Sequence, residues 1–241
     1  MIHRFDTIDS TMHEAARLAE AGCPAGTAVV AAEQTAGRGR FGRRWHSEKG
    51  QGLYVSVVLR PDVAPADLPV VTLALGLSVR NAIAGVTGLA CDLRWPNDVL
   101  IGEKKCAGVL AELHGGAVVA GIGINVNQRE FPAEIAGIAT SLRLAAGREH
   151  SLDHLLPALL ARIDDGVRLL ENAGRAAVLE QFAAASSYAR GKRVIVGLAG
   201  GEVEGLTDGL DSSGFLLLRR DNGERTVILA GGVRPAKPPC S

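Results

Sequence analysis

The sequence predicts an α+β protein in which a mixed β-sheet with helices is followed by a small β-barrel. Three observations predict this fold. Runs of β-branched residues, bounded by turn residues, are interspersed with segments of helical periodicity. Several neighbouring runs are separated by only a few residues, which favours antiparallel or mixed pairing over a doubly wound parallel sheet. At Gly191 the helical pattern gives way to short strands punctuated by glycine turns.

The first helix is predicted at residues 10–21, STMHEAARLAEA. Thr11 and Glu14 stand at the spacing of a capping box, and Gly22 and Pro24 follow the last apolar residue. We therefore expect Thr11 to cap a short helix.

Five β-branched runs follow, and each predicts a strand. They are TAVVAAE (27–33), LYVSVVLR (53–60), CDLRW (91–95), KCAGVLAEL (105–113) and AVVAGIGINV (117–126). A helix is predicted between the second and third runs, at residues 66–84, and Asp98 is expected to open a further strand. Residues 102–104 and 114–116 have the composition of hairpin turns.

The last part of the chain changes character after one long helix. Residues 151–184 predict that helix, because Leu155, Leu159 and Ile163 recur on one face. Four short strands are then expected, namely KRVIVG, GEVEGLTDGL, GFLLLRR and RTVILAGG. Strands of this length and number suit a small barrel. We therefore expect two domains, at residues 1–188 and 189–241.

Composition and charge exclude several classes of protein. The 26 basic residues equal the 26 acidic residues, which argues against the broadly positive surface that nucleic-acid binding requires. The apolar stretch at residues 68–86 is interrupted by polar residues and predicts a buried helix, not a membrane span. No signal peptide or paired-cysteine motif is evident, so the four cysteines are expected to be reduced thiols in the cytoplasm. No metal site is predicted.

The segment GRGRFGRRW (37–45) places Arg38, Arg40, Arg43 and Arg44 among glycines with no acidic residue between them. Because the net charge of the chain is zero, this positive cluster is local and suits a small anion. Glycine lets backbone amides approach a ligand closely, and guanidinium groups bind phosphate or carboxylate in a fork. The alternative is a solvated basic loop.

Two further segments contain more polar residues than a core requires. In RWPNDVLIGEKKCAGVLAEL (94–113), a hairpin is expected to bring Lys105 within reach of Asp98, where its charge would stabilise a transferring phosphoryl group. The alternative is an ordinary turn at Asn97 and Asp98. In GIGINVN (121–127), the glycines leave room for a ligand against the strand, and Asn125 suits an adenine-like edge.

Taken together and in this order, these segments resemble the biotin protein ligases. The resemblance extends over nearly the whole chain and includes DST (9–11), AEQTAGRGRFGRRW (32–45), SEKGQGLYVSVVLRP (47–61), RWPNDVLI (94–101), KKCAGVLAEL (104–113), GIGINVN (121–127) and TSL (140–142). It implies a catalytic domain akin to class II aminoacyl-tRNA synthetases, followed by an SH3-like barrel. It also implies that the protein makes biotinyl-5′-AMP from biotin and MgATP, then transfers biotin to a lysine of a biotin carboxyl carrier protein domain.

The resemblance implies roles for individual residues. Lys105, Arg40 and Asp98 are expected to be catalytic. Residues expected to bind biotin or the adenylate are Ser10, Thr11, Gln34, Gly37, Arg38, Gly39, Arg40, Trp45, Asn97, Lys105, Gly108 and Asn125. Asn97 and Asp98 match the WPND pair, whose role is to orient magnesium or the incoming lysine.

The resemblance also bears on partners. The chain begins directly at the catalytic segment, so binding to DNA is not expected. No membrane partner is expected either, and both a monomer and a homodimer fit the sequence. Two alternatives stay open. One is a lipoyl or octanoyl transferase, for which Cys106 beside Lys105 would supply a nucleophile. The other is a non-catalytic sensor of biotin or nucleotide.

Three positions depart from the family pattern. Met12 stands where many relatives have Asn, Arg94 stands where Lys commonly precedes WPND, and AGGVRP replaces the usual ending of the barrel. The first two departures affect the polarity of the expected pocket. The third affects the contribution expected from the barrel.

Overall fold

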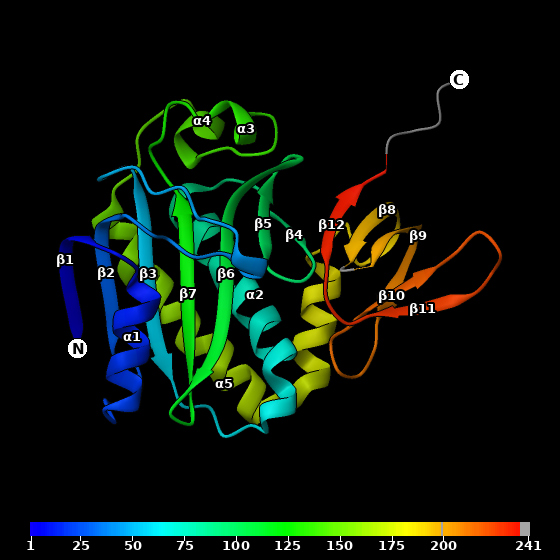
Figure 1. Cartoon of the computed structure of the whole chain (residues 1–241), viewed down its shortest axis with the longest axis horizontal. Helices are drawn as coiled ribbons and strands as arrows, with labels where there is room; N and C mark the ends of the chain where they lie inside the picture. Colours follow the sequence, from blue (N-terminus) through cyan, green and yellow to red (C-terminus); the bar gives the residue numbers. More distant parts are fainter. Residues whose placement is uncertain (199, 237–241) are drawn as a thin grey trace.

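A seven-stranded mixed sheet forms the larger part of the protein (Figure 1). The computed structural model describes residues 1–198 and 200–236. The strands lie in the order β1-β2-β3-β7-β6-β5-β4. Only β1 and β2 pair in parallel, and all other neighbours are antiparallel, so the predicted mixed sheet is confirmed. The strand bounds are β1 (Ile2–Ile8), β2 (Ala28–Gln34), β3 (Gly52–Leu59), β4 (Asp92–Arg94), β5 (Asp98–Ile101), β6 (Lys104–His114) and β7 (Ala117–Asn125).

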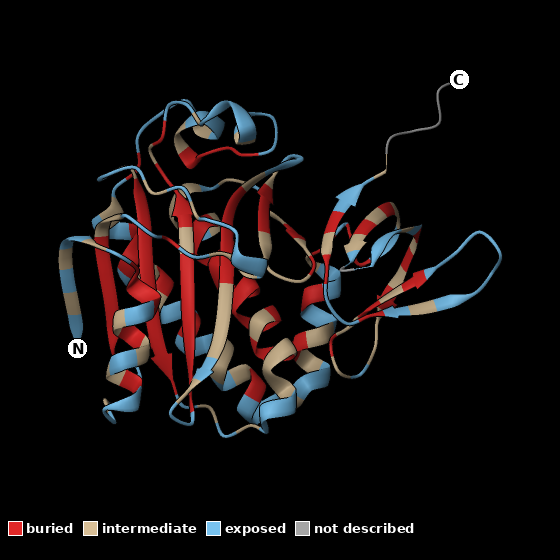
Figure 2. Ribbon diagram, in the orientation of Figure 1, coloured by how far each residue is buried: buried red, intermediate tan, exposed pale blue. Residues whose placement is uncertain are grey.

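Helices cover both faces of this sheet. Helix α1 (Thr11–Glu20) buries Met12, Ala15 and Ala19 against one face. Helices α2 (Leu68–Thr87) and α5 (Leu152–Ala184) cover the other face and share the main hydrophobic core with it. The central strands β3 and β7 are therefore buried almost throughout, as Figure 2 shows.

Helix α2 resembles a membrane span by length and composition alone. Within the stretch Pro65–Thr87, which includes the short 3-10 helix Pro65–Asp67, the most apolar 18 residues have a mean hydropathy of 1.5, but 61% of them are buried inside the protein. Its apolar residues pack against the sheet and α5. The stretch is therefore the buried core helix that the sequence predicts.

The N-cap of α1 differs from the prediction. Ser10, not Thr11, is the cap, and its side chain accepts a hydrogen bond from the backbone N–H of Met12. The Thr11 hydroxyl instead bonds Gln34 and Ser56, at 3.0 and 2.8 Å. The capping-box assignment was wrong because the sequence does not reveal these partners on β2 and β3.

A second, five-stranded antiparallel sheet follows α5 (Figure 1). Its order is β11-β10-β9-β8-β12, and its strands are β8 (Arg190–Leu198), β9 (Gly201–Leu210), β10 (Leu216–Arg219), β11 (Arg225–Ile228) and β12 (Gly232–Pro235). The prediction of four strands was wrong. Only the first four residues of RTVILAGG form β11, and the chain then turns at Gly231, where φ is 154°, to pair β12 with β8.

Besides β12, three short helices and strand β1 were not predicted. Strand β1 lies at the edge of the sheet with mostly exposed side chains, so it lacks a clear apolar pattern. The short helices are α3 (Ala133–Ala136), α4 (Leu142–Ala146) and the 3-10 turn Arg40–Gly42. Cys240 and most of the C-terminal tail lie outside the described residues; Cys23, Cys91 and Cys106 are free thiols, as expected.

The two sheets share one hydrophobic core. Val194, Leu216 and Leu218 of the second sheet belong to the same buried cluster as the first. A buried hydrogen bond also joins them, because the indole N–H of Trp95 donates to the carbonyl of Gly214 at 2.9 Å. The second sheet is therefore held against the segment that precedes β5.

Replacing Trp95 with Phe should lower the stability of the protein. The substitution leaves the buried Gly214 carbonyl without its donor, which typically costs about 1–3 kcal/mol. The measurement is the midpoint of urea unfolding. As a control, Leu229→Ala removes an exposed side chain of the second sheet region and should change the free energy of unfolding by less than about 0.5 kcal/mol. Equal midpoints for Trp95→Phe and wild type would contradict this role.

Candidate functional site

A cavity of about 250 Å³ opens beside the α1 face of the first sheet. It is lined from several parts of the chain: the arginine-glycine loop (residues 37–45), strands β6 and β7, the WPND turn, the segment around α3, and Gly231 and Gly232. Most of the predicted site residues line it, namely Thr11, Gln34, Arg38, Gly39, Arg40, Trp45, Asn97, Asp98, Lys105, Gly108 and Asn125. Ser10 is fully buried at the N-cap, and Gly37 lies in the base of the loop; neither lines this cavity.

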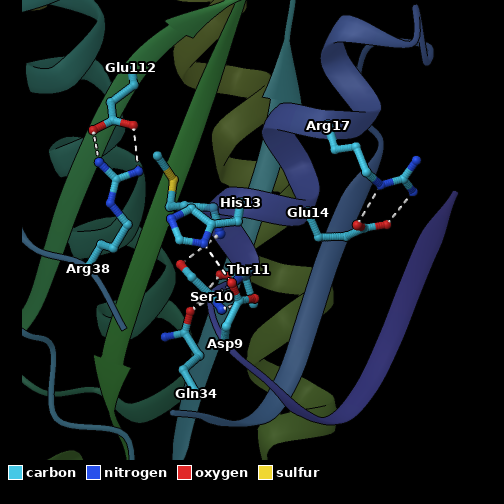
Figure 3. A network of polar contacts seen from close by, with 10 residues as sticks. Asp9, Ser10, Thr11, His13, Glu14, Arg17, Gln34, Arg38 and Glu112 are labelled. Atoms are coloured by element: carbon cyan, nitrogen blue, oxygen red, sulfur yellow. Dashed lines mark hydrogen bonds and ion pairs between the residues drawn. The ribbon is translucent and has the colours of Figure 1, made fainter. Parts of the chain in front are cut away.

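The polar residues on the β2 and α1 side of the cavity form a connected network (Figure 3). The Gln34 carbonyl oxygen accepts hydrogen bonds from both the backbone and the hydroxyl of Thr11. Asp9 accepts from the backbone N–H of Ser10 and pairs with His13, and these contacts hold the pKa of Asp9 below its usual value. The start of α1 is thereby fixed against β2.

Lys105 and Asp98 form an ion pair at the opposite side of the cavity. The Lys105 ammonium lies 2.5 Å from Oδ1 of Asp98, and Arg94 donates to Oδ2 at 2.8 Å. Burial raises the pKa of Asp98, but these two cations outweigh that effect and hold the pKa below its usual value. Asp98 is therefore an ionised carboxylate with a cation on each oxygen.

A β-bulge aims Lys105 into the cavity. Val99 pairs with Ala107, but Leu100 pairs with Lys105, so Cys106 is an extra residue in β6. Strict alternation would send Lys105 to the core and Cys106 to the cavity. The bulge reverses both. The backbone N–H of Lys105 donates to the carbonyl of Ile138, and its carbonyl accepts from the N–H of Thr140.

Cys106 is consequently buried on the face away from the cavity. Its thiol contacts the carbonyl of Val99 at 3.4 Å and belongs to the main core. The neighbouring Cys91 thiol and burial raise the pKa of the Cys106 thiol. A protonated, buried thiol is a poor nucleophile, so the geometry does not support the transferase alternative.

The arginine-glycine loop is a small hairpin, and its arginines have different surroundings. Arg40 donates to the side chain of Asn97 at 3.1 Å, and burial lowers the pKa of its guanidinium, which nonetheless stays charged. The Arg38 guanidinium forms a bidentate ion pair with the carboxylate of Glu112 in β6, with N–O distances of 2.8 and 3.0 Å. The carboxylate that balances Arg38 thus comes from outside the loop, as Figure 3 shows.

The remaining two arginines of the loop also line the cavity. Arg44 donates to the backbone carbonyl of Thr35 at 2.6 Å. The side chain of Arg43 has no hydrogen bond or ion pair within the part of the chain that the structure describes, although its backbone bonds Gly39 and Arg40. Its guanidinium is therefore available to an anion. The sequence contains this signal in GRRW, although Arg43 was not among the predicted binding residues.

Two glycines of the sheet make room for Trp45. A Cβ atom on Gly123 would lie 2.4 Å from the indole ring, and one on Gly108 would lie 3.1 Å from it. The Lys105 ammonium lies 5.3 Å from the centre of the ring, and the indole N–H is buried without a partner among the described residues. Trp45 thus forms an apolar wall with one unused donor.

The glycines of GIGINVN line the cavity, and side chains of the protein also lie against them. That a ligand lies against these glycines stays a prediction. Gly121 is covered by Met12, whose sulfur would lie 2.5 Å from an added Cβ atom, and Gly123 is covered by Trp45. Asn125 likewise uses its amide N–H₂ to hold the carbonyl of Thr140, at 3.0 Å. These contacts are between distant segments and leave no signal in the local sequence.

Comparison with known proteins decides between the families that share such a site. The family model described as the biotin/lipoate A/B protein ligase family matches residues 5–128, and that of the biotin protein ligase C-terminal domain matches residues 190–233. The chain belongs to the biotin protein ligase family. The second match lies on the five-stranded sheet, in the part of the chain where the resemblance implied a C-terminal barrel.

Several members of the biotin protein ligase family are similar over most of the chain. The bifunctional ligase/repressor BirA of Bacillus subtilis is 36% identical over 234 residues, which cover 93% of this chain and 71% of that relative. The biotin acetyl-CoA-carboxylase ligase of Paracoccus denitrificans is 33% identical, with 92% and 95% covered. The structure of the Aquifex aeolicus biotin protein ligase in complex with biotin and ATP has a TM-score of 0.87 and 36% identity, with 98% and 99% covered.

Gly123→Ala should displace Trp45 from the sheet. The added methyl group would lie 2.4 Å from the indole, which is too short for any real contact, so the ring must move towards solvent. The measurement is a shift of tryptophan emission to longer wavelength, since the only other tryptophan, Trp95, is buried. Gly85→Ala is the matched control, because its methyl group would meet open space. Unchanged emission in Gly123→Ala would contradict the proposed packing.

Proposed function

We propose that the protein is an ATP-dependent biotin protein ligase that forms biotinyl-5′-AMP and transfers biotin to a lysine of a biotin carboxyl carrier protein domain. The observation that carries the proposal is the group of cations around one cavity, with Lys105 held at Asp98 and Arg40 held at Asn97. A carboxylate must attack a polyanion in this reaction, and fixed cations offset the repulsion between them.

The first step joins two anions. A carboxylate oxygen of biotin attacks the α-phosphorus of ATP, the bond to the β-phosphate breaks, and pyrophosphate leaves. Lys105 is placed to stabilise the charge shared by the carboxylate and the α-phosphate, and Arg38 and Arg40 to hold the phosphate. In this assignment the Arg38 guanidinium leaves the Glu112 carboxylate and binds the phosphate of the ligand instead.

The second step consumes the mixed anhydride. The neutral amine of the acceptor lysine attacks the biotinyl carbonyl carbon, the bond to the phosphate oxygen breaks, and AMP leaves. The attacking nitrogen releases one proton to solvent as the amide forms. No covalent enzyme intermediate is needed. The loop, closed over the adenylate, excludes the water that would otherwise hydrolyse it.

The remaining predicted residues have binding roles in this proposal. Thr11 and Gln34 bond the ureido end of biotin, with Ser10 supporting Thr11 from the N-cap. Gly37, Gly39 and Gly108 allow close approach of the backbone, while Trp45 and Asn125 contact the adenylate. The free indole N–H of Trp45 supports this assignment, since a buried donor without a partner costs free energy until a ligand supplies one.

Magnesium enters as part of the MgATP substrate. Asp98 is the one carboxylate among the lining residues, and both its oxygens already hold cations. Among the described residues there is no cluster of three or more metal-ligating side chains. We therefore assign the ion to the phosphates and not to a protein site.

The wider assignments follow from family membership. Residues 1–188 would form the catalytic domain, akin to class II aminoacyl-tRNA synthetases, and residues 189–241 the SH3-like barrel. We further propose that the enzyme acts in the cytoplasm, as a monomer or homodimer. Because the net charge of the chain is zero, we do not expect it to bind DNA.

Lys105→Ala should remove most biotin-dependent pyrophosphate release from ATP. Losing one such charge typically costs roughly 10²- to 10³-fold in rate, and the fold should persist because Lys105 is not part of the core. Lys104→Ala is the control, since the neighbouring lysine is exposed and does not line the cavity. Near-normal turnover in Lys105→Ala would refute the assignment. Absence of biotin-dependent release from the wild type would favour a sensor.

Arg40→Gly should loosen the hold on the adenylate. With this cation removed, biotinyl-AMP should dissociate faster, and the released anhydride should acylate lysines of unrelated proteins. The measurements are the dissociation rate of biotinyl-AMP and streptavidin blotting of a bystander protein. Arg129→Gly, an exposed arginine outside the cavity, is the control. An unchanged dissociation rate would mean that the loop does not retain the adenylate.

A further inference from the structure

A series of side-chain contacts runs from the cavity to the second sheet. It begins at Asp98 and passes through Arg94 and Tyr188 to Lys192, the third residue of β8. Lys192 is the only member that belongs to the second sheet.

Arg94 controls how much of the Lys105 charge is available. Two cations surround the Asp98 carboxylate, so one positive charge remains in excess. Without Arg94, Lys105 alone would neutralise Asp98 and the excess would vanish. The guanidinium has little freedom, because its Nε and Nη2 both donate to Oδ2 of Asp98, at 3.3 and 2.8 Å.

Tyr188 supports Arg94 from the other side. The guanidinium carbon lies 5.9 Å from the centre of the Tyr188 ring, a distance at which cation–π attraction operates. Tyr188 is 1% exposed. The residues before it are bonded to β4, because Ser186 donates to the carbonyl of Leu93 at 2.6 Å and Ser187 bonds the carboxylate of Asp92.

The outer end of the series is fixed by Glu103. The Tyr188 hydroxyl donates to Oε2 of Glu103 at 2.6 Å, and Lys192 donates to Oε1 at 3.2 Å. The Lys192 ammonium lies 4.9 Å from the centre of the same Tyr188 ring. Burial and Glu103 raise the pKa of Tyr188 to about 12, so the phenol remains a donor at neutral pH.

We propose that Tyr188 is a positioning residue for Asp98 and Lys105, acting through Arg94, and that it makes their geometry depend on the second sheet. The proposal rests on the biotin ligase function proposed above. Tyr188 touches no substrate in it; the ring holds the guanidinium against Asp98, and Glu103 and Lys192 hold the ring. The second sheet thereby contributes to the charge of the cavity without lining the part around Lys105.

The test is a double-mutant cycle on biotin-dependent pyrophosphate release. Tyr188→Leu should lower kcat by about three- to tenfold, as expected for residues in contact, with little change in KM for biotin. Arg94→Ala should lower kcat by at least as much. In the Arg94→Ala background, Tyr188→Leu should have no further effect, because its route to Asp98 is already lost. Tyr188→Phe retains the ring and should restore most of kcat.

Controls separate positioning from stability. Tyr54→Phe removes the hydroxyl of another fully buried tyrosine, one that bonds the backbone of Glu48, and its effect should be independent of Arg94→Ala. Should Tyr188→Leu not fold, the same cycle uses Glu103→Gln, whose side chain is 63% exposed. The proposal would be overturned if Tyr188→Leu lowered kcat by the same factor in the wild type and in the Arg94→Ala variant. The same holds for Glu103→Gln if that variant is used instead. An active wild type with such additivity refutes only this inference, whereas an inactive wild type refutes the proposed function.

Discussion

The ion pair between Lys105 and Asp98 is the interaction on which the site depends. Two partly buried charges are stable only when each is paired and well oriented, and here the pairing requires a bulge in β6, the WPND turn and Arg94 together. The backbone of Lys105 is held in turn by the segment after α3. The bulge, the WPND turn, Arg94 and the segment after α3 therefore all help to direct the Lys105 ammonium group into the cavity.

The shape of the cavity depends on a second feature, the glycines of β6 and β7, which have no side chain on the cavity face of the sheet. Bare glycines in β6 and β7 allow the Trp45 ring to lie against the sheet, and Met12 covers the next glycine. Side chains from the loop and from α1 thus take the positions that strand side chains would otherwise fill. The result is an apolar wall next to a group of cations, which suits a ligand with an apolar body and an anionic end.

The second sheet contributes both to the packing of the first sheet and to the wall of the cavity. It shares the hydrophobic core of the first sheet, accepts the hydrogen bond of Trp95 and supplies Gly231 and Gly232 to the cavity wall. Arg94 and Trp95 are adjacent in the sequence, and both contact residues where the two sheets meet: Arg94 lies against Tyr188, and Trp95 bonds Gly214. The WPND turn is consequently held from the side of the second sheet as well as by β5 and β6.

The sequence by itself determined the order of most helices and strands, because apolar periodicity reports which local structure can bury its side chains. It also determined the family and most of the residues that meet in the cavity. Strand β1 escaped prediction because an exposed edge needs no apolar pattern, and β12 because its pairing with β8 is set at long range. Only the tertiary structure decided that Lys105 and not Cys106 faces the cavity, that Glu112 balances Arg38, and that Tyr188 lies beside Arg94. Each of these depends on a bulge or on contacts between distant segments, and neither is encoded in local composition.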